Sequence, residues 1–155
     1  MNKLTHIDAS GAASMVDVSA KPLMQRHAIA RGEIHLQRAT LDLIGANQIA
    51  KGNVLATARL AGIMAAKKTG DLIPLCHPLP ITHCEVQFET PTSRDRIVIT
   101  ASASIIAQTG VEMEELTAVS IAALTIYDMC KAVDKMMRIT DVALISKTKT
   151  PLPPA

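Results

Sequence analysis

Alternation of apolar and polar residues predicts four strands along the chain. The two-residue period covers residues 28–37, 81–89, 96–106 and 138–146. Successive side chains of a strand point to opposite faces of a sheet, so this pattern is typical of strands with one buried face. The sequence therefore predicts a sheet with an apolar face that another layer must cover.

Two longer helices are predicted between these strands. Asn53 is a favourable N-cap for a helix over 54–68, a range rich in Ala, Leu and Met. The sequence Thr-Gly-Val-Glu at 109–112 has the spacing of a capping box, and helical spacing continues from there to about Lys135. A short helix or turn falls within 40–50.

The predicted elements follow the order β-α-β-β-α-β. This is the split β-α-β order of ferredoxin-like α+β folds, and the right-handed crossover rule places both main helices on one face of an antiparallel sheet. No linker divides the sequence, so we expect a single domain over 1–155. Residues 1–25 lack a clear period and predict an irregular arm, while three prolines in 148–155 predict a disordered tail.

The composition narrows the classes of function. Hydrophobic residues make up 48% of the 155 residues, and the net charge is only +2, which is too weak to favour nucleic-acid binding by charge alone. No apolar run is long enough to cross a membrane, and no apolar segment opens the sequence, so we expect a cytoplasmic protein without membrane contact. The three cysteines fit reduced thiols in that compartment.

The long helix has apolar residues on two faces. Residues at three- and four-residue steps form the stripe expected to cover the sheet: Leu116, Val119, Ala123, Ile126, Cys130 and Val133. The opposite face is apolar first and charged later, with Thr117, Ile121, Leu124, Asp128, Lys131 and Lys135. A helix that is apolar on both sides is buried on both sides, so we expect the second face to contact another subunit.

Asp128 and Lys131 are three residues apart and lie one turn apart on the same helix face. On spacing alone, the simplest interpretation is a solvated ion pair. At the rim of a buried interface, however, loss of solvation would lower the pKa of Lys131 toward neutrality, while Asp128 would raise it. A lysine in that position can donate or accept a proton, so the pair is a candidate for acid–base catalysis.

Other residues have both a structural and a functional interpretation. Lys51 precedes the predicted helix cap at Asn53, which is either a plain cap or an anion site at a helix N-terminus. The pairs Cys76-His77 and His83-Cys84 suggest zinc, but adjacent ligands do not match the spacing of common structural sites, and we expect no metal. His77 lies between two prolines, so it is either an exposed loop residue or a ligand contact held by a rigid loop.

Charged residues near the start of the long helix and on or near the first strand also have two possible interpretations, one structural and one functional. The acidic residues of the first helical turn complement the helix dipole or bind donor groups of a purine or pterin ring; they are Glu112, Glu114 and Glu115. Three arginines are either solvated or available to bind phosphate: Arg26, Arg31 and Arg38.

Several stretches together resemble the cyclic pyranopterin monophosphate synthase family of molybdenum cofactor biosynthesis. They are LTHID (4–8), MVDVSAK (15–21), KGNVLATARLAGI (51–63), DLIPLCHPLPI (71–81), TGVEMEELTAVSIAALTIYDMCKA (109–132) and LISK (144–147). The stretches LIPLCHP, TGVEME and YDMCKAV are specific as a set, and the resemblance covers about residues 4–147 in one register.

The resemblance implies a reaction and an assembly. The substrate would be 3′,8-linked cyclic dihydro-GTP, and the products cyclic pyranopterin monophosphate and pyrophosphate, formed without a cofactor. The chain would form a homohexamer, a trimer of dimers, with the active site at the dimer interface. The acid–base pair would be Asp128 and Lys131. The substrate-binding segments would be Leu75-Cys76-His77 and Met113-Glu114, with Lys51, Glu112 and Lys147 as further pocket residues.

Two departures from the family pattern and one alternative remain. Many relatives have Asp at the position of Asn53, and either residue caps a helix. Many also end in a glycine-rich basic tail, for which Lys147 and Lys149 are the substitutes here. Ferredoxin-like domains also serve as non-catalytic small-molecule binding modules, or bind RNA through sheet aromatics. The RNA alternative is weak because Phe88 is the only aromatic residue on a predicted strand.

Overall fold

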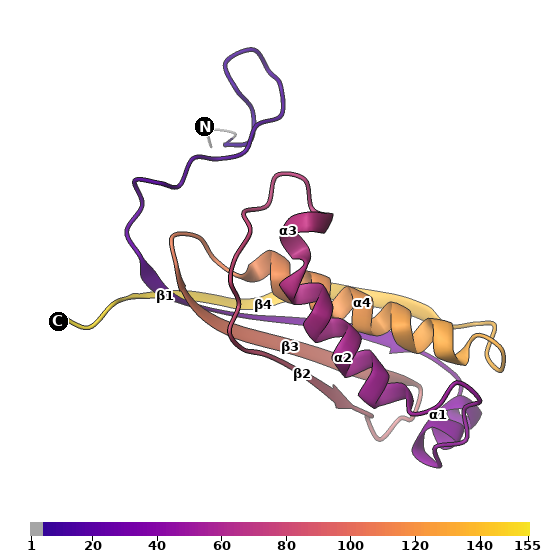
Figure 1. Ribbon diagram of the computed structural model, residues 1–155. Helices are drawn as coiled ribbons and strands as arrows, with labels where there is room; N and C mark the ends of the chain where they lie inside the picture. Colours follow the sequence, from indigo (N-terminus) through magenta and orange to yellow (C-terminus); the bar gives the residue numbers. More distant parts are fainter. Residues whose placement is uncertain (1–4) are drawn as a thin grey trace.

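A computed structural model describes residues 5–155 (Figure 1). The elements are β1 (Met24–His35), α1 (Arg38–Gly45), α2 (Val54–Lys67), α3 (Thr69–Leu72), β2 (Cys84–Glu89), β3 (Arg96–Ala107), α4 (Glu112–Cys130) and β4 (Arg138–Pro151). Expectations for residues 1–4, including the first part of the predicted arm, lie outside the described residues.

The four strands form one antiparallel sheet in the order β2-β3-β1-β4. Strand β1 runs through the middle, with Ala30 opposite Ala101 of β3 and opposite Leu144 of β4. The two strands that follow α2 and α4 lie at the two edges, which is the strand order of a split β-α-β fold. The predicted ferredoxin-like α+β class is confirmed.

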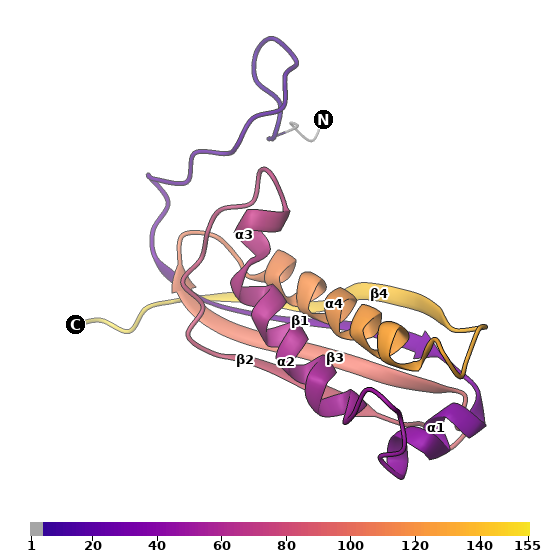
Figure 2. The ribbon, with the colours of Figure 1, turned by 45° about the vertical axis from the view of Figure 1, so that its right-hand side comes forward.

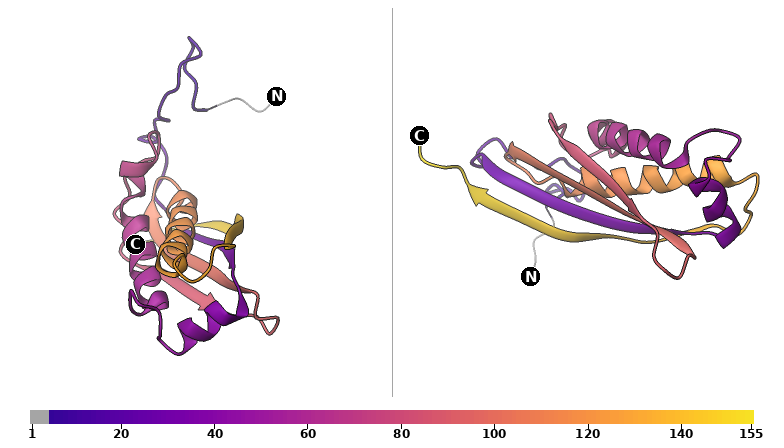
Figure 3. Two further views of the ribbon diagram at one scale, coloured as in Figure 1. Left: turned by 90° about the vertical axis from the view of Figure 1, so that its right-hand side faces the viewer. Right: turned by 90° about the horizontal axis from the view of Figure 1, so that it is seen from below.

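Both main helices pack against the same face of the sheet, as expected (Figures 2 and 3). Helices α2 and α4 lie side by side and contact each other, and each contacts strands of the sheet. The short helix predicted within 40–50 is α1, beyond the end of β1 (Figure 1).

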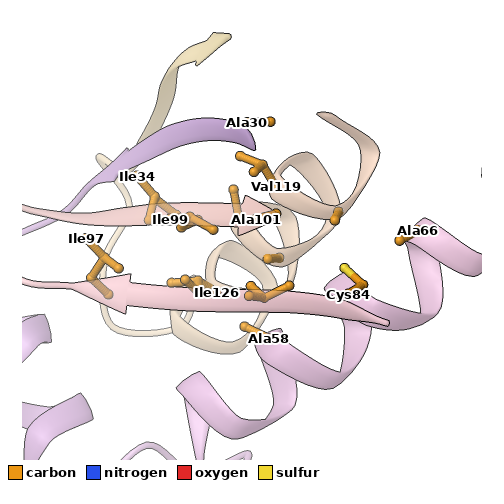
Figure 4. Packing of buried hydrophobic residues seen from close by; sticks show 14 of the residues in the cluster. Ala30, Ile34, Ala58, Ala66, Cys84, Ile97, Ile99, Ala101, Val119 and Ile126 are labelled. Atoms are coloured by element: carbon orange, nitrogen blue, oxygen red, sulfur yellow. The ribbon is translucent and has the colours of Figure 1, made fainter. Parts of the chain in front are cut away.

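Small side chains allow the helices to lie close to the sheet and to each other. Ile34, Ile99 and Ile126 are fully buried among many alanines (Figure 4). At Gly32 of β1, an added Cβ would lie 2.6 Å from a methyl group of Val119 on α4. A side chain at this position would push α4 away from the sheet, and glycine avoids that. The core, which has no buried aromatic side chain among the described residues, is therefore filled by small side chains packed closely together.

The burial of residues on α4 largely agrees with its two predicted faces. Val119, Ala123, Ile126 and Cys130 of the predicted stripe are buried. Val133 was wrongly included, because the helix ends at Cys130 and Val133 is 52% exposed. On the opposite face, Leu124 is 52% exposed, so the single chain leaves this apolar face uncovered in part.

The predicted capping box at 109–112 is wrong. The N-cap residue of α4 is Val111, and no side chain caps the helix there. The carboxylate of Glu112 instead accepts a hydrogen bond from Lys147 on β4. The nonlocal ion pair therefore replaces the local cap that the sequence suggested.

The prediction of a disordered tail is wrong for residues 148–151. These residues continue β4 and pair with the first four residues of β1, from Thr148 opposite His27 to Pro151 opposite Met24. Strand β1 begins four residues earlier than its alternation suggested, and its free backbone groups bind the extended tail. Residues 5–23 form an irregular arm with one isolated bridge, between Ile7 and Ala13.

Candidate active site

The candidate residues gather at the two ends of α4. Glu114 lies in its first turn and Asp128 in its last. These positions are 14 residues apart, about 21 Å along an α-helix. The two groups therefore form separate sites within one chain.

A cavity of about 920 Å³ lies at the N-terminal end of α4. The arm, the loop after α3, the start of α4 and the end of β4 line it. It brings together seven of the eight predicted substrate-binding residues, Leu75, Cys76, His77, Glu112, Met113, Glu114 and Lys147. Lys51 is the exception, because it lies at the other end of α4.

Two carboxylates in the cavity have opposite pKa shifts. Burial alone would raise the pKa of Glu112, but the 2.9 Å hydrogen bond from Lys147 Nζ helps to hold it below its ordinary value. Glu114 is 2% exposed, and burial, reinforced by the charge of Glu112, raises its pKa to about 7. Glu114 can therefore hold or release a proton near neutral pH.

The hydrogen-bonding capacity of these carboxylates is only partly used. Glu114 Oε1 has a weak contact with the thiol of Cys76, with Sγ 3.9 Å away. Glu112 Oε2 and Glu114 Oε2 are both buried without a hydrogen-bond partner among the described residues. A buried polar atom without a partner is costly, so both oxygens favour a ligand that brings N–H or O–H groups.

Cationic side chains also line the cavity. Arg26 is 9% exposed, and its guanidinium donates to the carbonyl oxygens of Ala107 and Gln108 at 3.1 and 2.9 Å. Lys21 and Lys149 also line the cavity. Sequence reasoning did not single out Lys21, although it ends the MVDVSAK stretch at 15–21. This set of cations suits an anion such as a phosphate chain.

His77 contacts the N-terminal arm rather than solvent alone. Its ring nitrogen Nε2 lies 2.6 Å from the carbonyl oxygen of Val16, so Nε2 carries a proton and donates it. The interpretation of His77 as a plain exposed loop residue is therefore wrong, because the side chain joins two walls of the cavity.

The group at the C-terminal end of α4 is a three-residue charge cluster. Asp128 accepts hydrogen bonds from Lys51 and Lys131, each at 2.8 Å, and all three side chains are about half exposed. The expected helix cap is confirmed, since Asn53 Oδ1 accepts from the backbone N–H of Ala56. This cap fixes the turn that presents Lys51 to Asp128.

Both Asp128 and Lys131 are held in their charged forms in the single chain. The hydrogen bond from Lys131, followed by that from Lys51, lowers the pKa of Asp128 to about 2. The same contact raises the pKa of Lys131. The expected loss of solvation at Lys131 is absent in the single chain, because its side chain is 56% exposed.

The two Cys-His pairs do not meet at a common metal position among the described residues. Cys76 contacts Glu114, whereas Cys84 lies 3.8 Å from Glu115 Oε2 in the core. Glu115 is 0% exposed, its second oxygen has no described partner, and burial raises its pKa to about 7. The sequence left Glu115 open between complementing the helix dipole and binding a purine or pterin ring, and its first-turn position carries no signal of this burial.

One group of possible metal ligands lies elsewhere, on the sheet: Glu33, His35 and Asp141. Glu33 already contacts Arg31 at 3.8 Å and Arg96 at 3.4 Å. The two guanidinium groups oppose a further cation, so this group is better explained as an ion-pair network.

Comparisons with known proteins agree on one family. A sequence model described as the MoaC family matches residues 15–150. A protein of Desulforapulum autotrophicum named cyclic pyranopterin monophosphate synthase is 56% identical over 148 residues, covering 96% of this chain and 91% of that protein. One of the same name from Chloroflexus aurantiacus is 57% identical over 146 residues, with 94% and 90% covered.

A third relative, from Mycobacterium bovis, is named cyclic pyranopterin monophosphate synthase 3. It is 57% identical over 145 residues, which cover 94% of this chain and 81% of that protein. Among the described residues, no helix combines the length and the apolar character that a bilayer crossing requires. On the extent of these matches, the chain belongs to the MoaC family.

Proposed function

We propose that this protein is a cyclic pyranopterin monophosphate synthase, a lyase of molybdenum cofactor biosynthesis. It converts (8S)-3′,8-cyclo-7,8-dihydroguanosine 5′-triphosphate to cyclic pyranopterin monophosphate and releases pyrophosphate. The observation that carries the proposal is the cavity at the start of α4, where cations and buried unpartnered carboxylate oxygens face one space. The names of the relatives support it and favour it over a non-catalytic binding module.

Two sets of residues that line the cavity suit the two parts of this substrate. Arg26, Lys147 and Lys149 bind the triphosphate, and their charges stabilise the pyrophosphate as it leaves. Glu114 and Glu112 accept hydrogen bonds from the N–H groups of the guanine-derived ring, which uses the oxygens left without protein partners. Leu75, Cys76, His77 and Met113 complete the binding wall.

Proton transfer belongs to the charge cluster at the other end of α4. Lys131 moves protons while the purine-derived ring opens and rearranges, and Asp128 orients it through the 2.8 Å contact. Lys51 holds the second oxygen of Asp128 and adds a positive charge near the phosphates. Burial of this cluster is needed to bring the pKa of Lys131 down toward neutrality.

A second chain supplies that burial and completes the site. Because one helix separates the two groups by about 21 Å, the charge cluster of one subunit must lie against the cavity of another. The assembly is a homohexamer, a trimer of dimers with the active site at the dimer interface, in the cytoplasm. Exposed apolar residues on α2 and α4, among them Leu60, Met64 and Leu124, support burial between subunits.

Turnover of the cyclic dihydro-GTP substrate tests the reaction. The purified protein is expected to release pyrophosphate from it and to release none from GTP, which has the same charge but lacks the bond between the sugar and C8. Binding of the cyclic substrate without pyrophosphate release would instead support a binding module.

Mixed oligomers test how the site is assembled. Lys131→Ala and Glu114→Ala remove opposite ends of α4, and each variant alone is expected to be nearly inactive. In oligomers formed by co-expression, random pairing restores about a quarter of the sites if the two ends come from different chains. The control combines Lys131→Ala with Asp128→Asn, at one end, and restores none. A monomeric mass at micromolar concentration, by analytical ultracentrifugation, contradicts the assembly.

A further inference from the structure

The N-terminal arm forms one wall of the cavity but has little buried surface to hold it. Nearly all of residues 5–23 are exposed. Val16 and Val18 are half-buried and line the cavity. The arm leads into the start of β1 and passes the loop after α3 (Figure 1). Its position therefore depends on specific hydrogen bonds more than on apolar packing.

Gln108 provides two of these hydrogen bonds. Its side-chain nitrogen Nε2 donates to the carbonyl oxygens of Ser19 at 3.1 Å and of Lys21 at 3.2 Å. These contacts span 89 and 87 residues of sequence, so they join the arm to the turn between β3 and α4. Beside the contact of His77 with Val16, this carboxamide holds the segment that carries Lys21 into the cavity.

The backbone of Gln108 is itself held in place. Arg26 donates to the carbonyl oxygens of Ala107 and Gln108, and Arg26 lies on the central strand β1. The support therefore runs from the central strand of the sheet, through Arg26 and Gln108, to the exposed arm. Lys21 ends this chain of contacts, and no carboxylate among the described residues forms an ion pair with it.

We propose that Gln108 is a positioning residue for substrate binding, because it fixes the arm so that the ammonium group of Lys21 faces the phosphate chain. The proposal rests on the proposed function for the identity of the anion. Gln108 also lines the cavity, but the contacts of its side chain are with the arm and not with the charge cluster of its own α4. Its effect belongs to the binding of substrate rather than to the chemical step.

The variant Gln108→Met tests this role without changing charge or side-chain length. It removes both N–H donors and leaves the arm held through the contact of His77 with Val16, so the segment that carries Lys21 loosens. KM is expected to rise about five- to tenfold, the effect of one lost charge-assisted contact, with kcat changed less than about twofold. Gln87→Met is the matched control, since the Gln87 carboxamide donates only to Glu85 on an exposed strand face.

A double-mutant cycle shows whether Gln108 acts through Lys21. Lys21→Met alone is expected to raise KM at least as much as Gln108→Met, and adding Gln108→Met to it is expected to change KM little further. Fully additive effects on KM overturn the proposal, because they place the action of Gln108 elsewhere. So does a fall in kcat with KM unchanged.

Two measurements remain decisive even if the wild type does not turn over the cyclic substrate, an outcome that would overturn the proposed function alone. Hydrogen exchange of the backbone amides of residues 16–21 is expected to be faster in Gln108→Met than in the wild type. The dissociation constant for inorganic triphosphate is expected to rise in Gln108→Met and to stay the same in Gln87→Met. Unchanged exchange or unchanged triphosphate binding overturns the proposal.

Discussion

The two ends of α4 carry acidic residues whose surroundings have opposite effects. At the N-terminal end, burial raises the pKa of both Glu114 and Glu115 to about 7. At the C-terminal end, hydrogen bonds from Lys131 and Lys51 lower the pKa of the exposed Asp128 to about 2. One helix therefore combines carboxyl groups that hold a proton near neutral pH with a carboxylate that stays ionised.

This difference shows why neither end is a complete site. The N-terminal end has a cavity and protonatable groups, but its Lys147 is held in an ion pair with Glu112. The C-terminal end has a candidate proton carrier in Lys131, but the hydrogen bond to Asp128 raises the pKa of that lysine and keeps it charged. Each end supplies what the other lacks, which is the physical argument for joining them across a subunit boundary.

The largest expected effect on activity comes from a substitution in the charge cluster at the C-terminal end of α4. Lys131→Ala is expected to lower the rate of pyrophosphate release by at least about 10²-fold, in line with losses of general acid–base groups. Its melting temperature should stay close to that of the wild type, because the side chain is 56% exposed. Lys68→Ala, at an exposed lysine after α2, is the control. Near-normal turnover of Lys131→Ala rules out its assigned role.

The next effect concerns the turn just after α4. The buried carboxylate of Asp134 accepts hydrogen bonds from the Gln37 backbone and the Thr40 hydroxyl, at 2.9 and 2.8 Å. Asp134→Ala leaves both donors unpaired and is expected to lower the free energy of unfolding by about 2–3 kcal/mol, measured by urea denaturation. The exposed Asp71→Ala should change it little.

The pH dependence sharpens this second prediction. Hydrogen bonds lower the pKa of Asp134 below 3.8 in spite of burial. Its contribution to stability is therefore present above about pH 4 and is lost as the pH falls through the lowered pKa. Asp134→Ala should remove that acid dependence, and an unchanged acid limb of the stability curve would argue against the assigned hydrogen bonds.

Glu115 at the N-terminal end should give the opposite pH dependence. Its pKa is raised from 4.5 to about 7, so the unfolded chain ionises first, and stability falls as the pH rises from about 4.5 to 7. Glu115→Gln does not titrate and is expected to be more stable than the wild type by about 1–2 kcal/mol at pH 8, with little difference at pH 4. Parallel stability curves for the two proteins contradict this.

The smallest expected effect on stability is at Lys51. Its contact with Asp128 is solvent-exposed, and exposed ion pairs contribute little to folding. Lys51→Met should shift the melting temperature by less than about 2 °C. The same variant should lower turnover clearly, because it removes a charge and one support of Asp128. A large loss of stability with normal turnover would reverse the interpretation.

Local patterns were enough to predict most of the fold. The alternation around Ile34, Ile97 and Val86 reflects one buried face of the sheet, and Asn53 caps α2 as its chemistry suggests. The capping box and the tail failed for a common reason. In each case a residue far away in sequence, Lys147 for Glu112 and β1 for Thr148–Pro151, provides the partner that a local pattern cannot show.

The candidate site divides in the same way. Family motifs located the cavity residues and the charge cluster, but neither motif nor spacing indicates that Lys51 lies with Asp128 rather than with His77. Lys21 and Gln108 were not singled out because their roles depend on where the arm returns to the body of the fold. The pKa of Lys131 was expected to be lowered by an interface that one chain does not contain.

The pairing of the last residues of β4 also bears on how the protein stays dispersed at high concentration. This strand lies at the edge of the sheet and has 14 residues, long enough to recruit a foreign strand through its unpaired backbone groups. Lys147 and Lys149 point toward the cavity side, and Pro151 lacks the backbone N–H that a foreign strand would need. Residues that suit an anionic ligand thus also make this edge a poor template for aggregation.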